Sequence, residues 1–212
     1  MRTQVRTQQG FSLVELMIAL VLGLVLVGGA VSVLTGTLRS NADLARMARL
    51  EEQLDGLMVL VLRDLRRAGG TSKPYLALTG GVSPFGLDAP GALAGETANS
   101  CVTFSYDLNR DGLLTTAAGA DERFGYRLKQ QMMQIRAGGL GCNADGSPGW
   151  ENAADASELE VTTLSFAIAT SSAGDVDTRQ VTVTLAGRMK SNPATARSLL
   201  RTVRLRNDIY TP

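Results

Sequence analysis

Three side chains that can donate oxygen ligands, Asp107, Asn109 and Asp111, occupy alternate positions just before Gly112. A calcium-binding loop begins with this D-x-N-x-D-G pattern, because alternate side chains converge on one hard cation and the glycine permits the turn. The pattern therefore predicts a calcium site, and calcium is the one cofactor that the sequence indicates.

The later positions of this loop fit calcium less well. The carbonyl of Leu113 and the hydroxyl of Thr115 occupy the next ligand positions, but Ala118 stands where a bidentate glutamate belongs. Asp121 and Glu122 could supply a carboxylate only if the loop is longer than usual. Since the same residue types also form polar turns between strands, a calcium site and a plain turn both remain open.

The sequence contains no histidine. This excludes Ser-His-Asp and Cys-His catalysis and the usual zinc sites, and it removes the commonest general base near neutral pH. No other constellation of residues takes its place, so we expect a protein that is not an enzyme. The net charge of +1 provides no broad basic field, and we expect no nucleic-acid partner.

The amino-terminal part of the 212-residue chain contains an apolar segment long enough to span a membrane. Residues 16–38 carry no charge and form about 34 Å of helix, against about 30 Å of hydrocarbon in a bilayer. Arg2 and Arg6 precede the segment, which keeps the amino terminus in the cytoplasm and exports the rest. The segment is too long for an ordinary signal peptide, and a plain membrane anchor explains neither Gly10 nor Glu15.

The two cysteines, Cys101 and Cys142, both follow the apolar segment. In an exported domain they would form one disulfide closing a loop of about 40 residues, which loop entropy makes worth about 4 kcal/mol. In a cytosolic domain they would remain thiols. The inferred topology favours the disulfide.

The stretch GFSLVELMIAL, residues 10–20, resembles the cleavage and methylation motif of type IV prepilins and of the related type II secretion pseudopilins. A short basic leader is followed by a glycine, a phenylalanine and a glutamate at the fifth position of the mature chain. The resemblance implies that a prepilin peptidase cuts between Gly10 and Phe11 and methylates the new amino terminus. Residues 1–10 would be the leader peptide, and the apolar segment would be retained.

Cleavage also gives Glu15 a partner. A carboxylate in an apolar segment is unfavourable by a few kcal/mol unless it is paired or lies near the interface. The cut would create an ammonium group at Phe11, one helical turn from Glu15, so the acid can neutralise its own amine or that of a neighbouring subunit. In pilins the second option is the proposed assembly contact.

The helical pattern continues beyond the membrane segment. We expect one helix from Phe11 to about Ala68, roughly 87 Å long. Residues 11–38 would form its transmembrane and filament-core half, and residues 39–69 would form an amphipathic half that packs under the globular domain. Gly69 and Gly70 provide the stop signal. The apolar positions of the second half recur every three or four residues: Leu44, Met47, Leu50, Leu54, Leu57, Met58, Val61, Leu62 and Leu65.

Residues 70–212 have the pattern of a β-rich domain exported to the periplasm. A Gly- and Pro-rich stretch, residues 71–100, is predicted to be an irregular loop. Five strand patterns follow it: residues 101–108, 123–136, 159–170, 179–190 and 198–208. The predicted fold class is α+β and type IV pilin-like, with the long amino-terminal helix packed on one antiparallel sheet.

The order of these segments resembles the minor pilins of the PilW type across nearly the whole chain. This resemblance implies a minor pilin, at the pilus tip or priming assembly, with other minor pilins, the major pilin and prepilin peptidase as partners. It would be a single-pass inner-membrane protein with a periplasmic domain before it joins the pilus. The alternatives are a minor pseudopilin of type II secretion and a membrane-anchored, calcium-dependent binding module.

Overall fold

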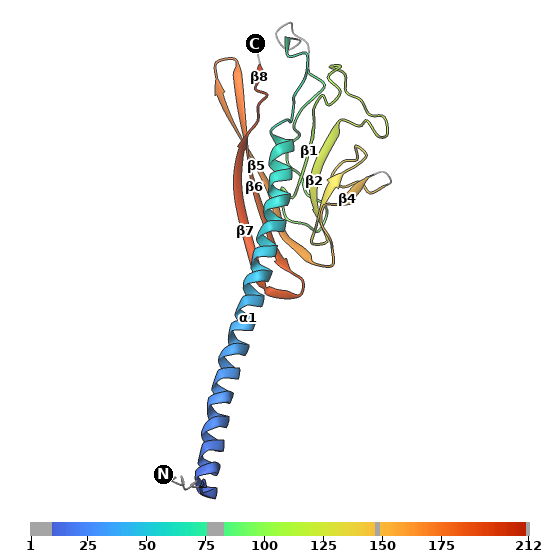
Figure 1. Ribbon diagram of the computed structural model, residues 1–212. Helices are drawn as coiled ribbons and strands as arrows, with labels where there is room; N and C mark the ends of the chain where they lie inside the picture. Colours follow the sequence, from blue (N-terminus) through green and yellow to red (C-terminus); the bar gives the residue numbers. More distant parts are fainter. Residues whose placement is uncertain (1–9, 76–82, 147–148, 211–212) are drawn as a thin grey trace, which may run out of the picture. The chain divides into compact units, whose positions relative to one another are not determined.

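The structure is a computed structural model that describes residues 10–75, 83–146 and 149–210. The chain divides into two compact units, Met1–Ala45 and Arg46–Pro212. One helix, α1 (Leu13–Leu65), contributes to both units, and the strands all belong to the second. The α+β, type IV pilin-like class is confirmed, because a long amino-terminal helix is combined with antiparallel sheets (Figure 1).

The boundaries of α1 differ slightly from those predicted. The helix begins at Leu13 rather than Phe11, and it ends at Leu65 rather than near Ala68. Its end tightens into a turn in which the amide of Ala68 donates to the carbonyl of Leu65 over 3.0 Å. Gly69 then takes a φ of +73°, the left-handed conformation that commonly terminates a helix. The 53 residues of α1 correspond to about 80 Å of helix.

The first sheet has the order β1-β2-β3-β4, and all its pairs are antiparallel. Its strands are β1 (Cys101–Ser105), β2 (Arg123–Lys129), β3 (Met132–Arg136) and β4 (Trp150–Asn152). The predicted single strand at residues 123–136 is wrong, because it folds back as the β2–β3 hairpin. Gln130 and Gln131 form its turn with φ values of 50° and 62°, as a two-residue type I′ turn requires. Glutamine is an uncommon residue there.

The second sheet has the order β5-β6-β7, with β8 paired to the start of β6. Its strands are β5 (Leu159–Ala173), β6 (Val176–Met189), β7 (Asn192–Arg204) and β8 (Ile209–Tyr210). The register places Phe166 opposite Val183 and Val181 opposite Val203, all of them buried. Ile168, two residues after Phe166 in β5, is half-buried.

The prediction of one five-stranded sheet is therefore wrong, because the described residues form two separate sheets. The edge of β1 is occupied by the preceding segment, where Leu87 and Gly91 form isolated bridges to β1. Strand β5 meets the first sheet through single backbone bonds. The amide of Phe166 donates to Asn99 over 2.9 Å and that of Val161 donates to Gln131 over 2.8 Å, so no ladder joins the sheets. Residues 76–82 of the predicted loop lie outside the described residues.

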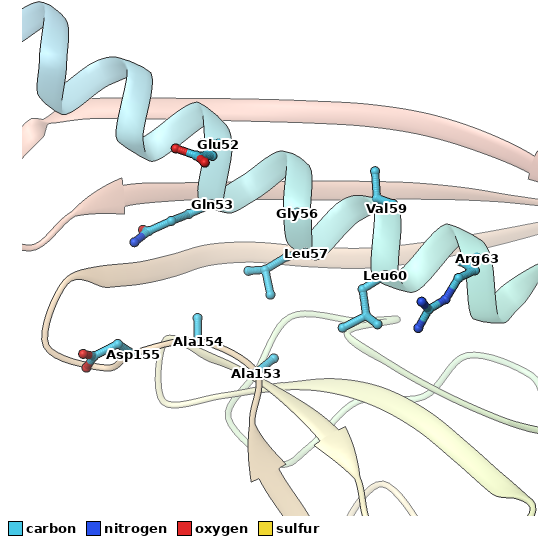
Figure 2. A pocket seen from close by; sticks show the side chains of 10 residues that line it. All are labelled: Glu52, Gln53, Gly56, Leu57, Val59, Leu60, Arg63, Ala153, Ala154 and Asp155. Atoms are coloured by element: carbon cyan, nitrogen blue, oxygen red, sulfur yellow. The ribbon is translucent and has the colours of Figure 1, made fainter.

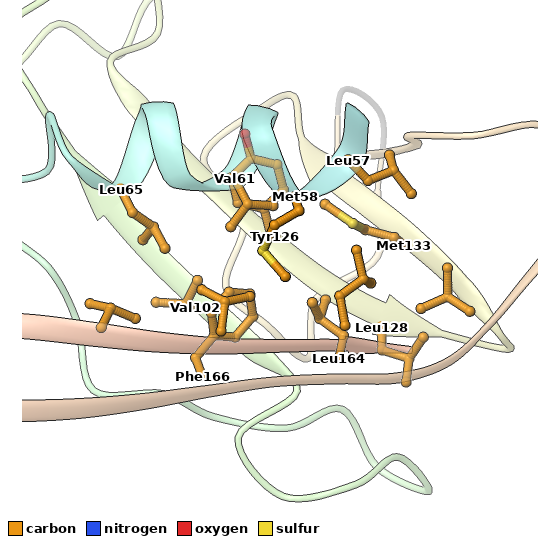
Figure 3. Close-up of a cluster of buried hydrophobic side chains, with 14 of the residues drawn as sticks. Leu57, Met58, Val61, Leu65, Val102, Tyr126, Leu128, Met133, Leu164 and Phe166 are labelled. Carbon is orange, nitrogen blue, oxygen red and sulfur yellow. The ribbon is translucent and has the colours of Figure 1, made fainter. Parts of the chain in front are cut away.

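The carboxy-terminal part of α1 supplies one wall of the hydrophobic core. Six of its side chains are buried: Leu50, Leu54, Leu57, Met58, Val61 and Leu65. Figure 3 shows this stripe facing side chains of both sheets, among them Val102, Tyr126, Leu164 and Phe166. Packing begins at Leu50, because Met47 is 39% exposed and Leu44 is 63% exposed.

A polar contact fixes the helix on the first sheet. The hydroxyl of Tyr126 in β2 donates to the carboxylate of Asp64 in α1 over 2.6 Å. Burial and the neighbouring Asp64 carboxylate raise the pKa of Tyr126, so this phenol remains a protonated donor at physiological pH. The contact satisfies a polar group inside an otherwise apolar interface.

Replacing Leu54 by alanine tests the role of the helix stripe. Leu54 is fully buried, and its Cδ2 lies 3.1 Å from the position a Cβ would take at Gly187 in β6. We expect Leu54→Ala to lower the free energy of unfolding of the β-rich unit by about 2–5 kcal/mol. Denaturant titration followed by circular dichroism measures this. Val59→Ala is the control, because Val59 is 64% exposed on the same helix. Equal effects of the two changes would contradict the packing.

Candidate processing and assembly site

The residues around the predicted cleavage position precede the helix and are exposed. Gly10, Phe11 and Ser12 have no regular secondary structure, and Phe11 is 82% exposed. A Cβ added at Gly10 would meet nothing within 4 Å, and its φ lies outside the left-handed region. Neither packing nor backbone conformation within the chain therefore requires glycine here. Residues 1–9 of the predicted leader lie outside the described residues.

Glu15 lies in the first turn of α1. Ser12 occupies the position before the helix, and its carbonyl accepts the amide of Leu16 over 3.1 Å. The spacing of Ser12 and Glu15 matches the capping-box pattern of a helix start, which the sequence analysis did not consider. An acid at this end of a helix also interacts favourably with the helix dipole. Glu15 is exposed, so no contact within the described part of the chain covers its carboxylate.

The amino-terminal part of α1 exposes apolar side chains on all sides. This helix is long and apolar enough to cross a membrane, and none of its most apolar stretch is buried. The core helix of a water-soluble domain can be equally apolar, but it would be mostly buried. The exposed stretch of α1 is therefore not a core helix of this kind. Leu26 is 74% exposed and Val33 is 69% exposed. Such a surface is stable only in lipid or against other apolar helices.

The two cysteines are joined in the β-rich unit. The Cys101–Cys142 disulfide links β1 to the segment between β3 and β4, with a Cα–Cα distance of 6.0 Å. Arg127 is the register partner of Cys101 on the neighbouring strand, and its side chain is only 1% exposed. Its guanidinium donates to the carbonyl of Cys142 over 2.8 Å and to that of Ala144 over 3.2 Å. Arg127 therefore holds the disulfide-bonded loop on the sheet.

The charge of Arg127 is balanced at the surface of the loop. Asp145 accepts from Arg127 over 2.5 Å and from Lys129 over 2.7 Å. Hydrogen bonds from Lys129 and Arg127 hold the pKa of Asp145 below its ordinary value. Trp150 in β4 covers the guanidinium at 4.5 Å from the ring centroid. Nothing in the sequence pattern singles out Arg127, because its acceptors on Cys142 and Ala144 are backbone carbonyls.

The calcium-like loop uses its oxygens for backbone hydrogen bonds. Asp107 Oδ2 accepts the amides of Ser72 and Gly112 over 2.9 and 3.1 Å. Asn109 Oδ1 accepts the amide of Asp111 over 2.9 Å. Desolvation raises the pKa of Asp107, but hydrogen bonds led by those from Ser72 outweigh it and hold that pKa below its ordinary value.

Two further predicted ligands belong to the same turn. Asp111 Oδ1 accepts the amide of Leu113 over 2.7 Å, and the hydroxyl of Thr115 lies 3.4 Å from Asn109 Nδ2. No group of three or more His, Cys, Asp or Glu residues suited to a metal occurs in the described part of the chain. These contacts are those of a polar turn, and calcium binding stays a prediction.

Glu122, the residue just before β2, closes this turn. It is 1% exposed, and its Oε1 accepts the amides of Leu108 and Asn109 over 2.7 and 3.2 Å. Its Oε2 accepts the amide of Thr115 over 2.8 Å. From its position in the sequence, Glu122 was predicted only as a late calcium ligand. The position of Glu122 in the sequence does not predict that its carboxylate accepts hydrogen bonds from backbone amides.

An apolar groove lies between α1 and the segment that joins β4 to β5. It has a volume of about 550 Å³. In Figure 2, Leu57 and Leu60 point from α1 toward Ala153 and Ala154, with Arg63 at one end of the groove. The opposite end carries three polar side chains: Glu52, Gln53 and Asp155.

Comparison with protein families matches two parts of the chain. The model described as the prokaryotic N-terminal methylation motif covers residues 5–31, which include Gly10, Phe11 and Glu15. The model described as prepilin peptidase-dependent protein B covers residues 43–205, and therefore most of the β-rich unit. No solved structure matches the chain.

Two curated relatives align with the chain. An uncharacterized protein of Haemophilus influenzae is 26% identical over 157 residues, covering 56% of this chain and 65% of the relative. Prepilin peptidase-dependent protein B of Escherichia coli is 27% identical over 140 residues, covering 66% of this chain and 68% of the relative. The chain thus matches about two thirds of the length of each.

The exposed motif, the apolar helix and the sheets define a type IV prepilin-like protein. Within this class, the chain belongs to the prepilin peptidase-dependent protein B family. An amino-terminal apolar helix with this motif is consistent with anchoring in a membrane.

Substitution of Glu122 tests the turn. Glu122→Ala leaves three amides without their acceptor, so we expect the free energy of unfolding to fall by about 2–4 kcal/mol. Glu122→Gln keeps the size of the side chain but turns an NH₂ group toward one of the amide donors, so part of this loss should remain. Glu52→Ala, at an exposed position of α1, is the control in the same denaturant titration. If Glu122→Ala were as stable as the control, the turn would not depend on this carboxylate.

Proposed function

We propose that this protein is a minor pilin of the type IV pilus, of the PilW type. It is inserted in the inner membrane with its β-rich unit in the periplasm, cleaved between Gly10 and Phe11, and methylated at Phe11. It then joins other minor pilins in a complex that primes assembly and lies at the pilus tip, in contact with the major pilin.

The observation that carries this proposal is the methylation motif on an exposed apolar helix that continues into a β-rich unit. In a protein with a discarded signal peptide, the apolar segment would be separate from the folded domain. Here the same helix continues to Leu65 and packs on the sheets. Since Gly10 meets no structural requirement within the chain, a peptidase that grips the extended backbone would account for a glycine at this position.

We assign the chain a structural rather than an enzymatic role. It has no histidine, and the Asp107 and Glu122 carboxylates are engaged by backbone amides. The runner-up function is a minor pseudopilin of type II secretion, which would share the leader, the helix and the sheets. The genes next to this one distinguish the two machines.

A membrane-anchored, calcium-dependent binding module is the third candidate, and the loop at Asp107–Asp111 favours it. Calorimetry of the full chain with calcium tests this candidate. Absence of heat at millimolar calcium would rule it out, because the loop would then be a turn alone.

The processing step is tested with Gly10→Val. A branched side chain before the cut should block cleavage, leave the precursor intact, and impair display of pili. Mass spectrometry of the protein from cells that contain prepilin peptidase measures cleavage, and electron microscopy of the same cells measures the display of pili. The native chain should begin with N-methyl-phenylalanine at Phe11, and the control Gly29→Val, in the apolar part of α1, should be processed normally. Normal piliation with Gly10→Val would contradict the proposal.

The assembly step is tested with Glu15→Ala and Glu15→Gln. Both variants should insert and be processed normally, because the cut lies outside the helix. Both should join the minor-pilin complex poorly, because neither offers a negative charge to the ammonium group at Phe11. Co-purification of the complex from membranes measures this. If Glu15→Gln assembled like the native chain, the charge of Glu15 would not be the assembly contact.

A further inference from the structure

Exposed arginines from separate segments gather where α1 ends. They line three adjacent open hollows of about 360, 380 and 410 Å³. All three hollows share Arg66, which follows α1, and Arg206, which follows β7. We call this set the arginine cluster: Arg63, Arg66, Arg67, Arg110, Arg204 and Arg206.

The backbone holds the two central arginines side by side. The amide of Arg206 donates to the carbonyl of Arg66 over 3.3 Å. The side-chain amide of Asn207 donates to the carbonyls of Arg67 and Ala68 over 3.3 and 3.1 Å, which caps the end of the helix. Leu205 is buried beside them. The backbone of the folded chain therefore fixes the spacing of Arg66 and Arg206.

Nearby acids are already engaged by other groups. Asp64 accepts from Tyr126, Asp107 accepts backbone amides, and Asp208 pairs with Arg204 over 3.2 Å. Within residues 10–75, 83–146 and 149–210, neither Arg66 nor Arg206 forms an ion pair. Arg63 also pairs with Asp64 over 3.4 Å, so the positive charge that the chain itself does not neutralise lies at Arg66 and Arg206.

The helix dipole explains only part of this arrangement. Cations near the carboxy-terminal end of a helix are favourable, which accounts for Arg63, Arg66 and Arg67. Arg110 comes from the loop after β1, and Arg206 comes from the segment after β7. Neither belongs to a helix end, so the helix dipole does not explain why these two arginines lie near Arg66.

Guanidinium groups bind carboxylates through two parallel hydrogen bonds, and several of them together match several carboxylates. A single-stranded nucleic acid would in addition stack its bases on an aromatic surface. Tyr106, which lines one hollow, has Arg67 over its ring at 4.2 Å and the ring of Phe124 stacked at 4.2 Å. Two groups so close must cover opposite faces, so Tyr106 offers no surface for stacking.

We propose that the arginine cluster binds an acidic segment of a partner protein, with Arg66 and Arg206 as the central contacts. Charge complementarity identifies this partner, and the proposal does not depend on processing at Gly10. The contact would add an electrostatic site on the β-rich unit to the apolar contact made by the amino-terminal helix.

A fluorescently labelled hexaglutamate peptide is the probe, measured by anisotropy with the full chain in non-ionic detergent at about 0.1 M salt. The variant Arg66→Gln with Arg206→Gln should bind at least ten-fold more weakly than the native chain. The matched control removes the same charge elsewhere, at Arg39→Gln with Arg201→Gln, both exposed. It should bind within about two-fold of the native chain, because charges beyond about 10 Å are screened at ordinary salt.

A second variant, Arg66→Lys with Arg206→Lys, keeps the charge but removes the forked geometry, and should give intermediate affinity. Circular dichroism shows that each variant is folded. Failure of the native chain to bind the peptide at millimolar concentration would overturn the proposal, as would equal losses in the cluster and control variants. Inorganic phosphate that displaces the peptide at equal concentration would indicate a small-anion site instead. An oligothymidylate that binds more tightly than the peptide would indicate nucleic acid, and either result overturns the proposal.

Discussion

The apolar stripe of α1 from Leu50 to Leu65 is the contact on which the β-rich unit depends. No ladder joins the two sheets among the described residues, and β5 meets the first sheet through single backbone bonds, so the stripe of α1 completes the core that both sheets share. The Tyr126–Asp64 hydrogen bond fixes the first sheet to the helix, and the Arg197–Glu51 pair links β7 to it. Apolar burial supplies the driving force, and these polar contacts set the position.

The same helix must satisfy two environments. Its carboxy-terminal part is one-sided because only one face is covered by sheets, whereas its amino-terminal part is apolar all round. A helix that is apolar on all sides needs lipid or other helices around it. The proposed function therefore requires that the cleaved protein retains this segment. A β-rich unit that worked alone in water would not need a helix with an apolar surface.

The sequence predicted the features that depend on local pattern. The apolar run, the helical spacing up to Leu65 and the motif at Gly10, Phe11 and Glu15 each arise from residues close together in the chain. The two-sheet arrangement could not be predicted in this way. It depends on a turn of two glutamines, Gln130 and Gln131, and on an edge of β1 that the irregular segment before it occupies. Glu122 was misjudged because its partners are backbone amides, which carry no sequence signature.

The arginines illustrate why residue type alone did not predict the disulfide-bonded loop contact or the arginine cluster. Arg127 is buried, and four acceptors and an aromatic ring satisfy it, so its charge is used to hold the disulfide-bonded loop. Arg66 and Arg206 are exposed, and the backbone brings them together without a counter-charge. In the first case the fold completes the hydrogen bonds of the guanidinium. In the second case the guanidinium groups keep donors that another molecule can use. The two cases differ only in the folded protein, where residues far apart in the sequence lie side by side.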